Sequence, residues 1–415
     1  MPILKHVHIK AFKSILDQRI ELGQLNVFIG TNGSGKSNIL EAIGMLSAAA
    51  TGEIDYSRLA DRGVRLSSPE VFRSAFSRIE RKHAFFIEGG FDDFLYHAHI
   101  TSVGESIGRF QWGYHAEKIV RGSDYRERIA GRSNSFVGIQ NIANFDKTSL
   151  QRHKSILNTA ESLGVFKANE MAAISALREY AIFAPSTPIL RGIANDESRK
   201  SPLGLYGGGM SKALSEIMAL KDNRLNKYII RFFKLLDWFS SVGVAKPEPS
   251  LQSSHVHTGP TVVSFTDKFM PKNFKQLYAY DVSEGALYVL FVLLLLANPN
   301  APNIFALDNV DNALNPSLVT ALVEDVAKYL SENPDKQVFM TSHNPTTLDA
   351  IDLFNSSHRL FVVKRGVSGA TEFERISPPR GMSREQWQEK YGYMKLSEIW
   401  LSGTIDGLNP PPKGF

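Results

Sequence analysis

The first fifty residues change from an alternating pattern of apolar and polar positions to a helical one. Val7 and Ile9 alternate with polar neighbours, and residues 25–29 form a short run that is largely apolar. Both patterns are typical of β-strands. Between residues 37 and 50, apolar side chains recur on one face of a helix. We therefore predict a strand, a glycine-rich loop and a helix, in that order.

The rest of the chain divides by pattern into three further stretches. Short β-like runs dominate up to residue 150, and helical periodicity follows, interrupted by a Gly- and Pro-rich loop at 185–209. Residues 247–260 are rich in Ser, His and Pro, which is typical of a linker, and the strand–helix alternation then returns. We predict an α/β protein with four parts: residues 1–55 and 256–415 form one core, 56–150 a β-rich lobe and 151–255 a mainly helical insertion.

Composition narrows the class of protein. The 415 residues are 43% hydrophobic and 21% charged, as in ordinary globular proteins, and they include no cysteine. Disulfides and thiolate metal sites are therefore excluded, and a cytoplasmic location is expected. The most apolar run, residues 287–297, is too short to cross a bilayer and predicts a buried helix, so we expect no membrane association. The net charge of +5 allows nucleic-acid contact without indicating it.

The most specific motif covers residues 30–37, Gly-Thr-Asn-Gly-Ser-Gly-Lys-Ser, between the predicted strand and helix. Its glycines let successive backbone N–H groups point at phosphates, and the helix that follows adds its dipole. Lys36 is expected to reach the β- and γ-phosphates, and the Ser37 hydroxyl to ligate Mg²⁺. The residues expected to bind ATP here are Gly30, Asn32, Gly33, Ser34, Gly35, Lys36, Ser37 and Asn38.

Two later strands end in side chains suited to the same site. Asp308 follows an apolar run, and an acid at the carboxyl end of a buried parallel strand can hold Mg²⁺ directly or through water. His343 follows the next such run, where it could lie beside the γ-phosphate; a lone histidine is more often structural. Ser283 precedes the apolar helix and is a good N-cap, so Ser283 and Gly285 mark either a second anion-binding helix start or an ordinary cap.

Taken in order, these motifs resemble those of the ABC-type ATPases of the SMC, RecF and overcoming-lysogenization-defect group. Residues 30–37 look like Walker A, 283–285 like the signature motif, 307–308 like the end of Walker B and 311–315 like the D-loop, with His343 as the switch histidine. Further short stretches along nearly the whole chain resemble small AAA-family ATPases found among bacterial defence genes: residues 61–63 (Asp-Arg-Gly), 190–191 (Leu-Arg), 207–209 (Gly-Gly-Gly) and 396–400 (Leu-Ser-Glu-Ile-Trp). The resemblance implies an ABC-type P-loop head that forms a homodimer or higher homo-oligomer around ATP and Mg²⁺, with Ser283 and Gly285 of one copy facing Lys36 of the other.

The chain departs from this pattern at one catalytic position. Family members usually have glutamate after the Walker B aspartate, whereas this chain has Asn309. An amide can orient a water molecule but cannot accept its proton, and general-base catalysis contributes about 10²–10⁴-fold. We therefore predict slow hydrolysis unless Asp311 or His343 substitutes. The residues assigned to catalysis are Asp308, Asn309, Asp311 and His343, and the metal ligands are Ser37 and Asp308.

Several functions remain open from the sequence. The first is a regulatory ATPase in anti-phage defence or a toxin–antitoxin arrangement, controlling a separate effector such as a nuclease. The second is an ATP-dependent DNA clamp in repair, and the third is a scaffold that does not hydrolyse ATP. Basic stretches at 121–128 and 224–234 could contact nucleic acid, or be solvated helix faces. His255, His257 and Asp267 could suggest a metal site, but a polar linker explains them better, and Gln140 is an unsupported candidate for the Q-loop.

Overall fold

The computed structural model describes residues 2–403 except 107–108, 134–135, 141–142, 145–149, 221–226, 229, 232–233 and 249–258. It forms two compact units, each discontinuous in sequence. The first contains residues 1–182, 302–309 and 330–415, and the second contains 183–301 and 310–329. None of the helices in the described ranges has the length and apolar character needed to span a membrane.

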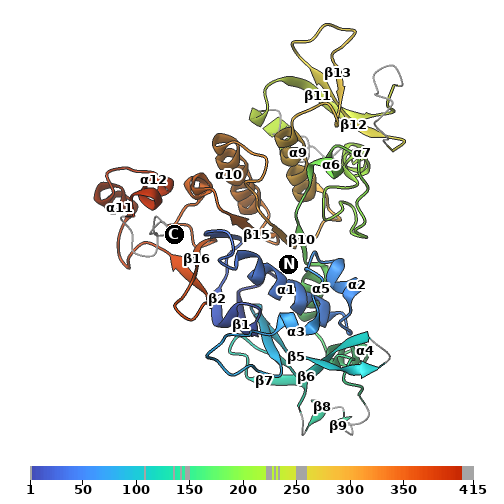
Figure 1. The fold of residues 1–415 in the computed structure, drawn as a ribbon, viewed down its shortest axis with the longest axis vertical. Coiled ribbons are helices and arrows are strands. Elements are labelled where there is room, and N and C mark those ends of the chain that lie inside the picture. The colour runs from blue at the N-terminus through green and yellow to red at the C-terminus, as the bar shows by residue number, and fades with distance from the viewer. Residues whose placement is uncertain are drawn as a thin grey trace. The chain divides into compact units, whose positions relative to one another are not determined.

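The nucleotide-binding motif belongs to the six-stranded sheet of the first unit, which has the order β10-β14-β15-β3-β16-β17. Figure 1 labels β10, β15 and β16 of this sheet. Its strands are β10 (Ala181–Phe183), β14 (Ile304–Leu307), β15 (Gln337–Ser342), β3 (Leu25–Ile29), β16 (His358–Arg365) and β17 (Thr371–Ile376). The four strands from β14 to β16 run parallel, and β17 pairs antiparallel with β16. The carboxyl ends of β14, β15, β3 and β16 therefore meet at one edge, where open α/β sheets bind ligands. The α/β class predicted from the sequence is confirmed.

The first unit also contains an eight-stranded sheet with the order β2-β1-β4-β5-β6-β7-β8-β9. Its strands are β1 (His6–Phe12), β2 (Ile15–Glu21), β4 (Phe85–Gly90), β5 (Phe94–Ser106), β6 (Arg109–Arg121), β7 (Glu127–Arg132), β8 (Val137–Ile139) and β9 (Ala143–Asn144). All neighbouring pairs are antiparallel. Val7 and Ile9 of β1 are fully buried in the core. Successive side chains of a strand point to opposite faces, and this accounts for their alternation with polar residues.

Helix α1 (Lys36–Ala50) follows the nucleotide-binding loop and packs against both sheets, contacting β1, β4 and β5 of one and β15 of the other. Every residue of α1 except Ser37 is buried. A helix that is enclosed on all sides needs small or apolar side chains around its whole circumference, which the sequence 42–50 provides. The packing fixes the direction in which the start of α1 points.

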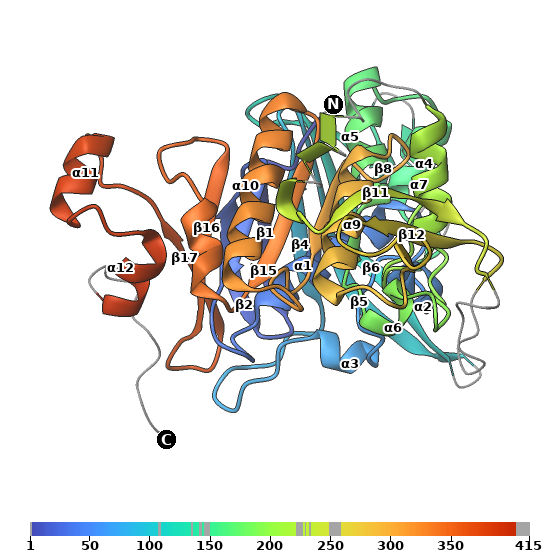
Figure 2. The same ribbon diagram turned by 90° about the horizontal axis from the view of Figure 1, so that it is seen from above.

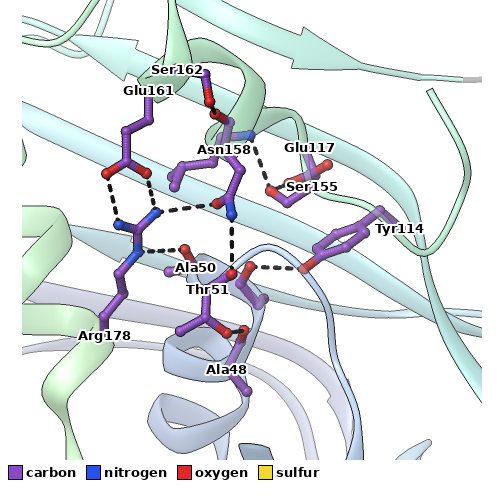
Figure 3. A network of polar contacts seen from close by, with 12 residues as sticks. Ala48, Ala50, Thr51, Tyr114, Glu117, Ser155, Asn158, Glu161, Ser162 and Arg178 are labelled. Carbon is purple, nitrogen blue, oxygen red and sulfur yellow. Dashed lines mark hydrogen bonds and ion pairs between the residues drawn. The ribbon is translucent and has the colours of Figure 1, made fainter. Parts of the chain in front are cut away.

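The last turn of α1 ends against side chains from three other elements, β6, α4 (Ile156–Ser162) and α5 (Ala168–Glu179) (Figure 3). The Tyr114 hydroxyl donates to the Ala49 carbonyl at 2.8 Å, and Arg178 Nε donates to the Ala50 carbonyl at 2.7 Å. Asn158 Nδ2 donates to the Thr51 carbonyl at 3.1 Å. The carbonyls that a helix cannot satisfy within itself therefore have partners here.

Shorter helices complete the first unit. These are α2 (Tyr56–Ala60), α3 (Pro69–Phe72), the 3₁₀ helix η2 (Pro345–Ala350), α11 (Arg384–Lys390) and α12 (Leu396–Ser402). Helix α12 packs on η2, and the Ser397 N–H and hydroxyl donate to the two oxygens of Asp349 at 2.9 and 2.8 Å. The segment that follows His343 is thereby tied to the C-terminal helix.

The second unit consists of helices and a small sheet, which are seen from a second direction in Figure 2. The helices are α6 (Thr187–Leu190), α7 (Met210–Ala219), α9 (Glu284–Ala297) and most of α10 (Pro316–Glu332), and the strands are β11 (Phe239–Ala245), β12 (Val262–Asp267) and β13 (Gln276–Tyr278). The predicted apolar helix is α9, and it begins after Ser283, which is its N-cap as the sequence predicts. Most of the predicted linker at 247–260 lies outside the described residues. The four-part division of the chain stays a prediction.

Candidate functional site

The loop between β3 and α1 takes a conformation that requires glycine. Gly35 is the N-cap of α1 with φ 106°, and a Cβ there would lie 2.1 Å from Thr371 Oγ1 and 2.9 Å from Ser14 Oγ. Gly33 has φ 77°, and a Cβ added there would have no heavy atom within 4 Å. No side chain caps the start of α1, and its first turn carries no acid. The first N–H groups of the helix are therefore available to an anion.

Lys36 lies directly over this loop. Its side chain is buried, and its ammonium donates to the carbonyl oxygens of Gly30 at 2.7 Å and Thr31 at 3.0 Å. Ser34 is also buried, and its Oγ has no hydrogen-bond partner among the described residues. A cation held over a loop of backbone donors, beside an unsatisfied buried hydroxyl, is chemistry that suits a phosphate chain.

The ends of β14 and β15 supply the acidic side of the site. Ser37 Oγ lies 3.1 Å from both carboxylate oxygens of Asp308, and the Thr341 hydroxyl donates to Asp308 Oδ1 at 2.5 Å. The Asn309 N–H donates to Thr341 Oγ1 at 2.8 Å. Thr341 thus holds the end of β14 against β15 and orients the carboxylate toward Ser37. Sequence analysis placed Ser37 and Asp308 in one site, and the structure brings them into contact.

Asn309 has a backbone conformation that accounts for its residue type. Its φ is 56°, in the left-handed region, and its side chain is exposed. Asn is among the few residues other than glycine that enter this region readily. The amide is therefore compatible with the turn that follows β14, whereas a longer acidic side chain would be less favourable there.

A chain of hydrogen bonds braces the loop from behind. The Arg65 guanidinium donates to Asn38 Oδ1 at 3.1 Å, and Asn38 Nδ2 donates to Ser14 Oγ at 2.6 Å. Ser14 Oγ and Thr371 Oγ1 lie 2.6 Å apart, and the Thr371 hydroxyl donates to the Ser34 carbonyl at 2.8 Å. The Asn38 side chain, assigned to nucleotide binding from the sequence, is engaged in positioning this loop.

Next to the loop lies a cavity of about 630 Å³. The cations that line it are Lys13, Arg65, Arg73, Arg81 and Arg365, with Glu70 as the carboxylate among the lining residues. Arg365 reaches the nucleotide-binding loop itself, because its Nε donates to the Gly33 carbonyl at 3.0 Å. The cavity therefore adjoins the loop on a strongly basic side, which suits a polyanionic ligand.

One wall of this cavity contains a buried charge cluster. Glu41, on α1, is 2% exposed and forms ion pairs with both Lys13 and Arg65. Burial lowers the pKa of the Lys13 ammonium to about 7, and the positive charge of Arg65 acts in the same direction. The Glu41 carboxylate opposes this effect by favouring both cations. The cluster ties the β1–β2 turn and residue 65 to the helix of the nucleotide-binding motif.

The remaining predicted residues are divided between the two units. His343 follows β15 in the first unit and is exposed. Ser283, Gly285 and Asp311 belong to the second unit, in which the Ser283 hydroxyl accepts the Ala286 N–H at 3.4 Å and Asp311 is buried. A Cβ on Gly285 would lie 3.2 Å from the Ala313 carbonyl, so the predicted signature and D-loop residues are close neighbours.

Sequence reasoning missed several residues of this site. Thr341 lies inside an apolar strand, and Thr371 and Arg365 lie far from the motif in the chain. One feature could have identified Arg365. It is a cation at the carboxyl end of a parallel strand that pairs with β3, and such a residue lies at the ligand-binding edge of the sheet. Arg65, Arg73 and Arg81 belong to no motif that the sequence analysis identified.

Other residues singled out in the sequence have different surroundings. Arg121 forms an ion pair with buried Glu170, and Arg231 pairs with Asp325 at 2.8 Å, so both are engaged internally. Gln140 is exposed after β8, near the end of the eight-stranded sheet that is remote from β1. His255 and His257 lie outside the described residues, as do residues 224–226, 229 and 232–233 of the second basic stretch.

The donor set fits ATP with Mg²⁺. Hydroxyl and carboxylate oxygens are the ligands that Mg²⁺ prefers, and Ser37 and Asp308 already converge. Backbone donors at the start of α1 and the Lys36 ammonium suit the phosphates. The adjoining cavity offers room and positive charge for the rest of a nucleotide.

Comparison with known proteins gives one family. The sequence profile described as "AAA domain, putative AbiEii toxin, Type IV TA system" matches residues 25–349, and no curated protein matches the chain. Among solved structures, the SMC head domain from Thermotoga maritima is 15% identical, with a TM-score of 0.41 over 90% of this chain and 99% of its own. The Pyrococcus furiosus Smc head with an extended coiled coil, bound to the C-terminal domain of ScpA, is 12% identical, with a TM-score of 0.47 over 95% of this chain and 99% of its own.

Proposed function

The chain belongs to this AAA-domain family, and on that premise we propose that it is an ATP-binding ABC-type ATPase in which ATP joins two copies into a dimer that controls a separate effector protein. Each nucleotide would lie between Lys36 of one copy and Ser283 and Gly285 of the other. The energy of binding two nucleotides would then become a conformational signal.

The observation that carries the nucleotide-binding part of this proposal is the contact between Ser37 and Asp308 at 3.1 Å beside the uncapped start of α1. These two side chains would hold Mg²⁺, which neutralises charge on the β- and γ-phosphates when bound. Lys36 would exchange its bonds to Gly30 and Thr31 for bonds to phosphate oxygens. Thr341 keeps Asp308 in position throughout.

The start of α9 supports the role of the second copy. Ser283 caps the helix through its hydroxyl, and the helix presents N–H groups and a positive dipole end at its first turn. Those groups are suited to the γ-phosphate of a nucleotide bound by another chain. Gly285 lets the neighbouring 311–315 turn approach closely, so that ATP contact and that turn would move together.

We propose that hydrolysis is slow because Asn309 replaces the usual glutamate. The amide has no group that accepts a proton from the attacking water, and the missing general base is worth about 10²–10⁴-fold in rate. The remaining candidates, Asp311 and His343, lie in different units. A long-lived ATP-bound dimer follows from slow turnover.

The biological role is proposed from the family description. That description names a putative AbiEii toxin of a type IV toxin–antitoxin system, which supports a place in anti-phage defence or a toxin–antitoxin arrangement in the cytoplasm. The effector would be made by another gene, and a nuclease is one option. An effector whose activity is indifferent to ATP and to Lys36→Ala would overturn this proposal.

The experiment that tests dimerisation is the mass of the purified protein with and without Mg-ATP, measured with phosphate release in the same samples. Ser283→Asp keeps an N-cap side chain but places a negative charge against the proposed γ-phosphate, whereas Ser283→Asn keeps the cap without the charge. We expect the Ser283→Asp variant to form no ATP-dependent dimer and the Ser283→Asn variant to form it as the wild type does. Binding of ATP to a single copy should be unchanged in both variants. Equal dimerisation by the two variants would contradict the shared site.

The catalytic proposal has its own matched pair. Asn309→Glu and Asn309→Gln impose similar backbone strain at φ 56°, but only glutamate supplies a base. We expect Asn309→Glu to raise the rate of phosphate release by about 10²-fold or more over Asn309→Gln. Rapid release by the wild type would mean that another residue is the base. If the dimer forms normally while turnover is absent in all three proteins, the chain is a scaffold that does not hydrolyse ATP.

A further inference from the structure

The loop that joins β12 and β13 in the second unit exposes three large apolar side chains. Phe269 is 80% exposed, Phe274 63% and Met270 42%. Single exposed apolar residues are common on protein surfaces, but a group of them on one hairpin tip marks a surface that contacts something else. We refer to residues 268–275 as the 268–275 loop. None of these residues belongs to the nucleotide site described above.

The 268–275 loop is held in a fixed shape by hydrogen bonds of its own. Asp267 Oδ1 accepts the N–H groups of Phe269 at 2.6 Å and Met270 at 3.0 Å. The Asp267 N–H donates to the Lys275 carbonyl at 2.8 Å, which closes the loop across its base. The aromatic rings are therefore presented by a formed turn, and a ligand would not have to order the backbone.

Three lysines alternate with the apolar side chains. Lys268, Lys272 and Lys275 are all exposed, and none of them forms an ion pair within the described part of the chain. The single acid between residues 262 and 278 is Asp267, whose Oδ1 accepts backbone N–H groups. The loop thus combines exposed aromatic rings with positive charge that no carboxylate of the described residues pairs with, and Lys268 Nζ lies 5.9 Å from the centroid of the Phe269 ring.

We propose that the 268–275 loop binds single-stranded nucleic acid. Bases would stack on Phe269 and Phe274, and the three lysines would contact the phosphates between and beside them. Stacking of unpaired bases on aromatic side chains, within a positively charged track, is the general way in which proteins hold single strands without sequence preference. The chemistry is the same for DNA and RNA at this level.

The composition of the loop favours this partner over others. Protein interfaces are depleted of lysine at their centres, whereas here lysines lie among the apolar groups. A duplex keeps the faces of its bases stacked inside and offers nothing to Phe269 and Phe274. Insertion into a bilayer would also bury the polar amide of Asn273. The three apolar side chains of the loop alone would give only weak membrane binding.

One arginine in each of the two basic stretches seen in the sequence is engaged within the protein. Arg121 and Arg231 are held in ion pairs with Glu170 and Asp325. Their charges are compensated, so they attract phosphates less than the lysines of the loop do.

The test uses the full chain without ATP and a fluorescent oligo(dT) of about 20 nucleotides, a length that exceeds the site of one small domain. We expect Phe269→Ala/Phe274→Ala to weaken binding about tenfold or more while leaving its salt dependence unchanged. Replacing the three lysines by Gln should lower the slope of log affinity against log salt by about 2, since each phosphate contact on a single strand contributes about 0.7. Leu401→Ala, at a position 64% exposed, is the control and should bind as the wild type does.

Because all the substituted side chains are exposed, each variant should keep the thermal midpoint of the wild type, which is measured alongside. The proposal is overturned if oligo(dT) does not bind at low salt, or if the phenylalanine and lysine variants bind it as the wild type does. Anionic phospholipid vesicles are tested in parallel. Binding to vesicles that is lost in the same variants, with no effect on oligo(dT), would assign the loop to a membrane surface instead.

Discussion

The two ends of helix α1 are built in opposite ways. At its start, Gly35 leaves the first N–H groups without a side-chain cap, and the first turn of the helix itself contains no acidic residue. At its end, Tyr114, Asn158 and Arg178 reach the carbonyls from three other elements (Figure 3). Each end of a helix has four backbone groups without a partner inside the helix, N–H groups at the start and carbonyl groups at the end. The difference shows that one end is kept open for a ligand while the other is closed by the protein itself.

The closed end also matches the helix dipole. No basic residue lies in the last turn of α1, so the cation comes from α5, where Arg178 pairs with Glu161 at 3.0 and 2.5 Å. A positive charge at the carboxyl end stabilises a helix. At the amino end the complementary negative charge would come from phosphate. Substitutions at the two ends should therefore separate ligand binding from basal stability.

The largest effect is expected from Gly35→Ala. The new methyl group would lie 2.1 Å from Thr371 Oγ1, in a backbone with φ 106° that alanine rarely adopts. We expect a loss of about 2–4 kcal/mol in the free energy of unfolding and no increase of the thermal midpoint on adding Mg-ATP. The control is Gly33→Ala, whose Cβ has open space, and for which about 1 kcal/mol is expected. Equal behaviour of the two variants would show that the contact with Thr371 is unimportant.

A smaller effect is expected at the closed end from Arg178→Met. This change removes a charged donor from the Ala50 carbonyl and leaves Glu161 without its partner. We expect about 2 kcal/mol lower stability in urea unfolding. The increase in the free energy of unfolding on adding Mg-ATP should be the same as in the wild type, because this increase depends only on the affinity and concentration of the ligand. A smaller increase would mean that the two ends are coupled.

Tyr114→Phe should have a weaker effect of the same kind. Burial raises the pKa of the Tyr114 hydroxyl well above its ordinary value, so the group remains a donor to the Ala49 carbonyl. That carbonyl also accepts the Gly52 N–H at 3.2 Å and keeps one partner in the variant. We expect about 1 kcal/mol lower stability, measured as a shift of the urea midpoint with an unchanged slope. A change in nucleotide affinity would contradict the separation of the two ends.

The smallest effect is expected from Glu161→Gln, and it should depend on pH. The hydrogen bonds from Arg178 lower the pKa of the Glu161 carboxyl below its ordinary 4.5. The stabilisation is therefore present above about pH 4.5 and is lost as the pH falls through the lower folded-state pKa. At pH 7 the free energy of unfolding of the wild type should exceed that of the variant by about 0.5 kcal/mol, because the pair is partly exposed to solvent. Unfolding curves at several pH values should converge under acid conditions; a constant difference would contradict the assignment.

The same comparison explains what the sequence could predict. The open end of α1 was found because its function is carried by adjacent residues, from Gly30 to Ser37, in the order that the chemistry needs. Asp308 was found because an apolar run that ends in an acid has a defined place in a parallel sheet. The closed end was not found, because Tyr114, Asn158 and Arg178 come from separate elements whose meeting point depends on packing.

Local backbone conformation also limited what the sequence could predict about the site. The sequence marks Asn309 as a departure in catalysis, but it does not reveal the left-handed backbone that favours asparagine there. Thr341 looks like a polar residue tolerated in a strand until its hydroxyl is seen between Asp308 and the Asn309 N–H. The cations of the cavity, such as Arg73 and Arg365, came together only in the folded chain.

The position of β3 in its sheet has a consequence for synthesis on the ribosome. β3 carries the nucleotide-binding loop and lies between β15 and β16, which are made near the other end of the chain. At ordinary translation rates, the loop waits about 15 to 60 s for these partners. During that interval the apolar surfaces of β3 and α1 are unprotected and depend on chaperones or on rapid elongation. A nascent chain therefore cannot bind ATP through a finished site until Arg365 has left the ribosome, so interrupted synthesis yields products without this activity.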